Sequence, residues 1–156
     1  MSIESRRQER VIDEVKYTVA PLPVGVGLKV LDRFKNVVAP LLAAGVKAAR
    51  NLEEAAADAL RALPAQLSAD DVEFFQKSFG EGGASYIDGG KIVPLTVEIQ
   101  GLHFAGNYMA LFDWLAFCME VNFAGFFGEL KKRASGALDK VKAKAPTSSA
   151  LPTTIG

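Results

Sequence analysis

The stretch YMALFDWLAFCMEVNFAGFF, residues 108–127, decides the fold. One helical face of this stretch carries Tyr108, Leu111, Phe112, Leu115 and Met119, and a second face carries Trp114, Phe117 and Val121. A helix with large apolar side chains on more than one face must be buried on most of its sides. The sequence therefore predicts a central helix from Gly106 onward, a break at Asn122, and a further helix over residues 123–144.

The same stretch is long enough to cross a membrane, since a span needs about 20 apolar residues. It carries Asp113, Glu120 and Asn122, however, and charged or polar groups at those depths are costly in a bilayer. We therefore expect a buried helix of a soluble domain and no membrane partner. Residues 1–10 hold several charges with no apolar run behind them, which is not the pattern of a secretory signal.

Amphipathic spacing before this stretch predicts three further helices. The first begins at Val24, and Pro40 inside it predicts a kink or a break, because proline costs about 3 kcal/mol in a regular helix. The second covers residues 52–63. The third begins after the capping residue Ser68 and stops at Gly80.

Alternating polarity over residues 15–20 predicts a short N-terminal strand, ended by the prolines that follow. Residues 86–93 predict a small β-hairpin, because the Asp-Gly pair at 88–89 is a favourable turn between two apolar pairs. The alternation continues through residues 95–99, which favours a longer second strand. A helix from Thr96 is the competing interpretation.

Together these elements predict an α+β fold that is predominantly helical, with about five helices, a short N-terminal strand and a small β-hairpin. The length suits a single globular domain, which we place at residues 1–144. Residues 145–156 are rich in proline, serine and threonine and predict a flexible C-terminal tail.

The composition argues against several functional classes. Lysine plus arginine and aspartate plus glutamate both number 18, so the net charge is zero, whereas a nucleic-acid binder is usually strongly basic. We therefore expect no nucleic-acid partner. With the single cysteine Cys118, the chain can form neither an internal disulfide nor a zinc cluster of thiolates, which favours a reducing compartment.

Candidate catalytic groups are few. His103 and Cys118, the only histidine and the only cysteine, would have to form a nucleophile–base pair. A buried inert cysteine, and a histidine that caps a helix or lies at a core edge, are the commoner arrangements. The glycines within residues 80–90 match neither the Rossmann nor the P-loop pattern and fit a hairpin better. We therefore expect no enzyme activity, no catalytic residue, no cofactor and no metal site.

The aromatic residues within 104–127 are the strongest functional signal. Most of them must belong to the core, but we expect a small domain to leave some uncovered. An uncovered remainder would form an apolar patch of the kind that binds a protein partner. The basic segment from Lys131 to Lys144 has two interpretations, a solvated helix face or an arm for an acidic partner.

The motif His103-Phe104-Ala105-Gly106 precedes the apolar helix, which leads to Glu120-Val121-Asn122-Phe123 and then Phe126-Phe127. This pattern resembles that of tail assembly chaperones of long-tailed bacteriophages. The N-terminal layout is also similar, with a strand ending in Leu-Pro, a Gly-Leu-x-x-Leu-x-x-Phe helix at residues 27–34, and Pro40. The resemblance spans most of residues 11–130, without the alanine-rich helix or the basic C-terminal stretch.

The resemblance implies a non-catalytic helper that binds the phage tape measure protein and assists tail-tube assembly in the cytoplasm of the bacterial host. The tail-tube protein is a second candidate partner, and self-association is a further option. The residues expected to contact the partner are Phe112, Trp114, Phe117, Phe123, Phe126 and Phe127. The alternative is a structural minor tail or connector protein retained in the virion. The third hypothesis is a small enzyme that depends on His103 or on clustered carboxylates.

Overall fold

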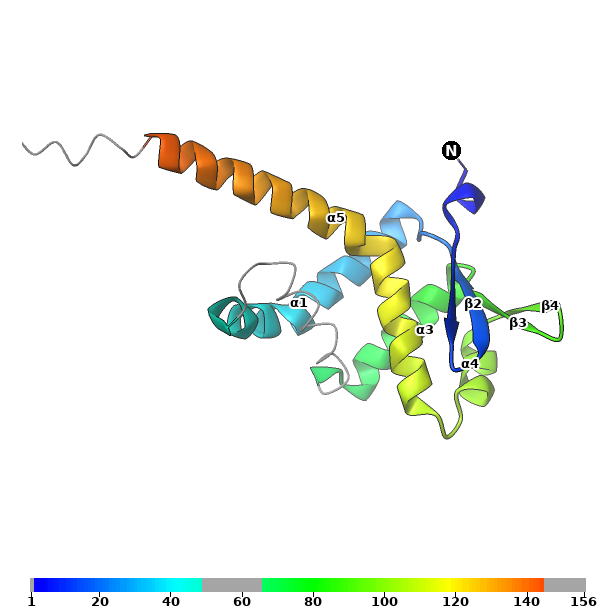
Figure 1. Cartoon of the computed structure of the whole chain (residues 1–156). Helices are drawn as coiled ribbons and strands as arrows, with labels where there is room; N and C mark the ends of the chain where they lie inside the picture. Colours follow the sequence, from blue (N-terminus) through cyan, green and yellow to red (C-terminus); the bar gives the residue numbers. More distant parts are fainter. Residues whose placement is uncertain (1, 49–65, 145–156) are drawn as a thin grey trace, which may run out of the picture. The chain divides into compact units, whose positions relative to one another are not determined.

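The computed structural model describes residues 2–48 and 66–144 and has an α+β fold (Figure 1). Its described residues form four α-helices and one four-stranded antiparallel sheet, which confirms the predicted class. The chain divides into two compact units, residues 1–124 and 125–156. The helix predicted over 52–63 and the tail predicted over 145–156 lie outside the described residues. The single domain over 1–144 stays a prediction.

The sheet begins with a hairpin of β1 (Gln8–Ile12) and β2 (Val15–Val19), after a short 3-10 helix over Glu4–Arg6. The strand predicted at 15–20 is confirmed, but β1 was missed. Its turn residues Asp13 and Glu14 have φ angles of 47° and 66°, the left-handed pair that matches the twist of a two-residue hairpin.

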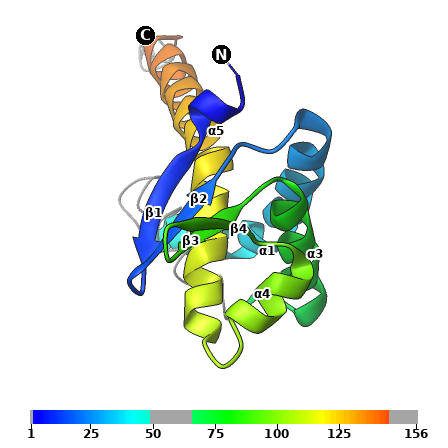
Figure 2. The ribbon, with the colours of Figure 1, turned by 90° about the vertical axis from the view of Figure 1, so that its right-hand side faces the viewer.

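The second hairpin, β3 (Ser85–Asp88) and β4 (Lys91–Pro94), confirms the predicted hairpin. Its turn residues are Gly89 and Gly90 and not the predicted Asp88-Gly89 pair, because Asp88 pairs with Lys91 in the ladder. β2 pairs with β3 through Tyr17–Tyr86 and Thr18–Ser85, so the two hairpins join into one sheet in the order β1-β2-β3-β4 (Figure 2). The N-terminal strand and the small hairpin are therefore parts of the same sheet and not separate elements.

Helix α1 (Val24–Ala48) continues through Pro40, so of the predicted kink or break the break is wrong, and the kink stays a prediction. A proline removes one hydrogen bond of the helical ladder, and this loss does not end the helix here. Helix α3 (Ala69–Glu81) confirms the predicted start, because the Ser68 hydroxyl accepts a hydrogen bond from Asp71 N at 3.1 Å. It ends at Glu81, with Gly82 and not Gly80 as the C-cap, because Gly82 N still donates to Ser78 O at 3.0 Å.

Helix α4 (Val97–His103) occupies the residues for which a continued strand was favoured, so that interpretation is wrong and the competing helix is correct. Thr96 caps it by accepting a hydrogen bond from Ile99 N at 3.4 Å. β4 ends at Pro94, and one more cross-strand bond, from Leu95 N to Ala84 O at 2.8 Å, follows before Thr96 begins the helix. The apolar alternation beyond β4 therefore belongs to a helix.

Helix α5 (Tyr108–Lys144) continues through Asn122, so the predicted break there is also wrong. The Asn122 side chain donates to Cys118 O at 2.8 Å and accepts from Leu22 N at 2.7 Å. Its Nδ2 shares the Cys118 carbonyl that accepts the helical hydrogen bond of residue 122, while its Oδ1 is held by Leu22 N, and the helix continues through this position.

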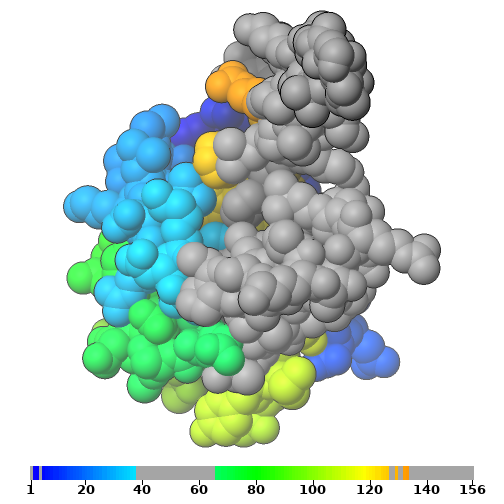
Figure 3. Space-filling view, turned by 90° about the vertical axis from the view of Figure 1, so that its left-hand side faces the viewer, coloured from blue at the N-terminus to red at the C-terminus, as the bar shows by residue number. Residues whose placement is uncertain are grey.

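The core of the 1–124 unit surrounds the first half of α5, where Trp114, Leu115 and Cys118 are fully buried. The elements packed around this helix contribute Tyr17, Val19, Val30, Phe34, Phe75, Phe79 and Leu95. α1 and α3 lie side by side on one face of the molecule (Figure 3). Residues Tyr108–Phe126 meet the length and hydropathy of a membrane span, a test that the core helix of a soluble protein also passes.

A close approach between α3 and α4 depends on Gly80. A Cβ at this position would lie 2.6 Å from Leu95 O and 2.8 Å from Gln100 Nε2. Gln100 is fully buried, and its Nε2 donates to Gln76 O at 2.9 Å and to Leu95 O at 2.8 Å. The bare backbone of Gly80 therefore leaves room for a buried amide that connects the two helices.

Candidate binding surface

Three of the six predicted partner-binding residues lie in the core. Trp114 is 0% exposed, Phe117 1% and Phe123 6%. Trp114 contacts Phe104 and Phe79 at ring-centroid distances of 5.5 and 6.4 Å. These rings fix the position of α5 within the 1–124 unit and do not reach its surface.

Phe117 and Phe123 also have defined neighbours inside this unit. The guanidinium of Arg10 lies 4.5 Å from the centroid of the Phe117 ring, and the Arg10 side chain forms an ion pair with Glu120. Phe123 stacks on Phe34 at 6.2 Å. Through these contacts α5 is joined to β1 on one side and to α1 on another.

The other three predicted residues differ. Phe112 is half-buried, and Phe126, in the 125–156 unit, is 43% exposed. The side chain of Phe127 lies outside the described residues. The structure therefore brings four of the six into one helical segment of the 1–124 unit, of which only Phe112 combines a core contact with exposed area. Their role toward a partner stays a prediction.

The most exposed apolar side chains near this helix were missed by the sequence analysis. Leu102 is 83% exposed, Tyr108 69% and Met109 63%. They flank the turn at residues 104–107, in the last turn of α4 and the first turn of α5. We refer to Leu102, Tyr108 and Met109 as the turn surface.

A local signal for the turn surface exists in the sequence. Asn107 caps α5 by accepting a hydrogen bond from Ala110 N at 3.2 Å, and Gly106 supplies the φ angle of 75° that the turn requires. A Gly-Asn pair before a helix predicts this cap, which places Tyr108 in the exposed first turn. The spacing of apolar residues alone had assigned Tyr108 to the inward face.

His103 lies at the end of α4, at the edge of the core. Its Nε2 is 2.8 Å from the Tyr17 hydroxyl, and its ring stacks on Tyr86 at a centroid distance of 4.0 Å. Burial lowers the pKa of His103, against the opposing charge of Asp88. Burial also raises the pKa of Tyr17 to about 12, with the charges of Asp13 and Tyr86 as smaller causes. Both groups are therefore neutral partners of one hydrogen bond at pH 7.

Cys118 is fully buried, and this burial raises the pKa of its thiol well above the ordinary value. The reactive form of a cysteine is the thiolate, which this environment disfavours. The hydrogen-bond partner of His103 is Tyr17, and the geometry thus gives neither residue of the hypothetical Cys–His pair an activated state.

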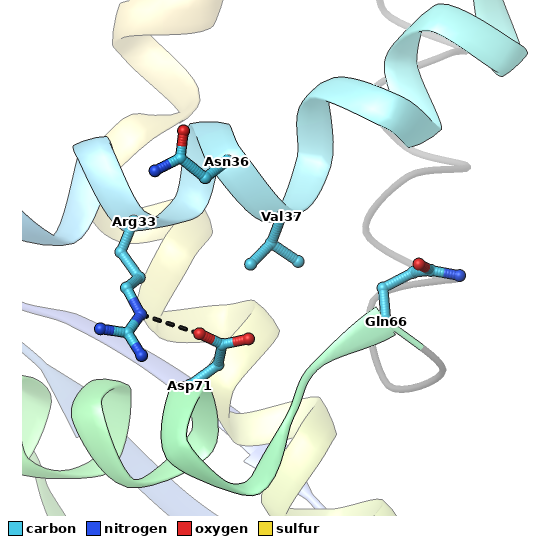
Figure 4. A pocket seen from close by; sticks show the side chains of 5 residues that line it. All are labelled: Arg33, Asn36, Val37, Gln66 and Asp71. Carbon is cyan, nitrogen blue, oxygen red and sulfur yellow. Dashed lines mark hydrogen bonds and ion pairs between the residues drawn. The ribbon is translucent and has the colours of Figure 1, made fainter.

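A hollow of about 480 Å³ lies between α1 and the start of α3, lined by Arg33, Asn36, Val37, Gln66 and Asp71 (Figure 4). Arg33 Nε donates to Asp71 Oδ1 at 2.8 Å across it. Burial acts to raise the pKa of Asp71, but hydrogen bonds from Arg33 and Ser68 lower it overall. This carboxylate is the capping partner of α3, so its charge serves the packing of the two helices. Among the described residues, no group of three potential metal ligands is present.

The described residues combine a buried aromatic core with exposed apolar side chains at the turn between α4 and α5. The model of the family "phage tail assembly chaperone protein, TAC" matches residues 13–137. The chain therefore belongs to the phage tail assembly chaperone family, a non-catalytic family. A search of curated proteins found no match, and a search of solved structures found none. The family resemblance seen in the sequence is confirmed.

Proposed function

We propose that this protein binds the phage tape measure protein and assists assembly of the tail tube around it, in the cytoplasm of the bacterial host. Family membership gives the partner class, the proteins of the phage tail. The observation that carries the proposal is the exposure of three large apolar side chains, Leu102, Tyr108 and Met109. They lie at the end of α4 and at the start of α5, on either side of the turn that joins these helices. Large exposed apolar side chains close together in the chain are the kind of feature from which a protein-binding surface is built.

A surface with exposed apolar side chains suits the task of keeping a tape measure protein in solution. A tape measure protein is a long helical chain whose apolar stretches would associate with each other if they were left exposed. A chaperone that presents apolar side chains can cover these stretches through helix contacts. Many copies that each bind weakly hold a long chain in solution, and tube subunits can displace them one by one. The tail-tube protein is the second candidate partner.

The six predicted partner-binding residues have different proposed roles. Phe112, which is half-buried, and Phe126, which is 43% exposed, are candidates for direct contact. Trp114, Phe117 and Phe123 are buried and support the helix that presents the surface. Phe127 is proposed as a contact from its place in the sequence alone.

Co-expression tests the proposal. The tape measure gene of the same phage is expressed alone, with this protein, and with an unrelated helical protein of similar size. We expect the soluble fraction of the tape measure protein to rise only with this protein, and the two to co-purify. An unchanged soluble fraction would contradict the proposal.

Mass spectrometry of purified virions separates the chaperone from the structural alternative. A chaperone acts during assembly and leaves, so its peptides should be absent from particles that contain the tube and tape measure proteins. A stoichiometric presence in particles would instead identify a minor tail or connector protein.

A further inference from the structure

The turn surface is held in a fixed geometry by its own backbone. Phe104, which is buried, follows Leu102 closely, and its N donates to Gln100 O at 3.0 Å. Asn107 N then donates to Phe104 O at 2.9 Å, directly before Tyr108. The apolar side chains of α4 and α5 are thus presented from a turn that is anchored in the core, which lowers the entropy cost of binding.

Three carboxylates lie beside the turn surface. Glu98 lies one helical turn before Leu102 on α4, and Asp113 lies one turn after Met109 on α5, so each shares a face with an exposed apolar residue. Asp13, in the β1–β2 turn, accepts a hydrogen bond from Asn107 Nδ2 at 3.4 Å. All three carboxylates are exposed.

The charge around this surface has one sign along the chain. From Ile92 to Leu130 the sequence contains Glu98, Asp113, Glu120 and Glu129 but neither lysine nor arginine. Glu120 is paired with Arg10, whereas neither Glu98 nor Asp113 forms an ion pair with any described residue. In a chain with zero net charge, this segment therefore carries only negative charge next to the exposed apolar side chains of the turn surface.

We propose that the turn surface, rimmed by Asp13, Glu98 and Asp113, binds a basic amphipathic helix of the tape measure protein. This inference rests on the function proposed above. An apolar stripe on such a helix covers the side chains of the turn surface, and its flanking lysine and arginine residues meet the carboxylates of the rim. The carboxylates of the rim favour basic segments over neutral or acidic ones. They also raise the rate at which such a segment associates with this protein at low salt.

Two pairs of variants test this in the full chain, co-expressed with the tape measure protein. The apolar test is Leu102→Ser with Met109→Ser, and its control is Val24→Ser with Leu28→Ser, which removes two α1 side chains that are 77% and 61% exposed. We expect about a tenfold loss of co-purified tape measure protein for the test pair, and no change for the control.

The charge test is Glu98→Lys with Asp113→Lys. Its control is Asp32→Lys with Glu73→Lys, which makes the same change in net charge with exposed residues of α1 and α3. We expect the test variant to lose binding of the tape measure protein and the control to retain it. Binding by the native protein should weaken as salt rises, because the rim is exposed. Circular dichroism confirms that each variant is folded.

The outcomes distinguish this inference from the proposed function. If the native protein solubilises the tape measure protein and both test variants do so equally well, the turn surface is not the binding site. If the native protein has no effect, both proposals fail. If the test variants lose only self-association in sedimentation velocity, the occupant is a second copy that presents its basic segment from Lys131 to Lys144, and the present assignment is overturned.

Discussion

Asn122 Oδ1 accepts a hydrogen bond from Leu22 N at 2.7 Å, and this bond joins α5 to the segment before α1. Leu22 lies between Pro21 and Pro23, which have no amide hydrogen, so its N–H is the only backbone donor of the Pro-Leu-Pro segment. The Asn122 amide thus satisfies a half-buried donor that the neighbouring prolines leave without a regular partner.

Replacing Asn122 with alanine should destabilise the protein by about 1 to 2 kcal/mol, because Leu22 N then loses its acceptor while the helix gains only a small increase in propensity. Urea unfolding followed by circular dichroism measures the change. Asn36→Ala, at an exposed position of α1, is the matched control and should stay within about 0.5 kcal/mol of the native protein. Equal effects of the two substitutions would show that the hydrogen bond between Asn122 and Leu22 does not contribute to the free energy of unfolding.

Gly80→Ala should destabilise the protein by at least about 2 kcal/mol, because the added methyl group would lie 2.6 Å from Leu95 O, against backbone that cannot move aside cheaply. Gly101→Ala in α4 makes the same chemical change where nothing lies within 4 Å. That control should stabilise the helix by up to about 1 kcal/mol. In thermal unfolding we expect a lower melting temperature for Gly80→Ala and a higher one for Gly101→Ala. A stabilising Gly80→Ala would contradict the close approach of α3 and α4.

The pair of His103 and Tyr17 predicts two pH effects of opposite sign. The pKa of His103 is lowered in the fold from its ordinary value of 6.5, so the unfolded chain binds more protons and stability falls as the pH drops below about 6.5. The pKa of Tyr17 is raised from 10.0 to about 12, so the folded chain keeps its proton and stability falls as the pH rises from about 10 to about 12.

Thermal unfolding across the pH range checks both effects. His103→Gln should reduce the loss of stability between about pH 6.5 and pH 5, and Tyr17→Phe should reduce the loss above about pH 10. A native protein whose melting temperature responds to pH in the same way as both variants would show that neither group carries the dependence.

Cys118 should be unreactive toward a thiol reagent until the protein unfolds, because the thiol is fully buried and its pKa is raised. The labelling rate in increasing urea should therefore follow the unfolding transition. Leu102→Cys in a Cys118→Ala background is the control and should react immediately, since residue 102 is 83% exposed. Fast labelling of native Cys118 would refute the buried core around α5.

Local signals predicted several elements of this fold correctly. The hairpin over residues 86–93 and the Ser68 cap each depend on neighbours in the sequence, and both are present, although the turn lies at Gly89-Gly90 and not at Asp88-Gly89. β1 was missed because most of its residues are polar or charged and exposed, so it shows no alternation; β2 holds it in the sheet through backbone pairing. The break expected at Asn122 failed because its amide bonds to Leu22, a residue far away in the sequence.

The candidate site could be predicted only in part. The sequence identified α5 as the aromatic helix, but periodicity cannot tell which of its faces other elements cover. Trp114 and Phe117 are covered by α3, β1 and the residues after α4, and these contacts come from distant parts of the chain. Leu102 and Tyr108 were not recognised as surface residues because the helix α4 and its turn into α5 had been interpreted differently.

The pairing of β2 with β3 has a consequence during synthesis on the ribosome. Tyr17 and Thr18 are made early, but their partners Tyr86 and Ser85 emerge only after α1 and α3 have been translated, and Trp114 follows later still. The N-terminal hairpin must therefore wait with one edge open and its apolar side uncovered. This chaperone is thus itself a nascent chain with unprotected apolar surface until its own last third has left the exit tunnel.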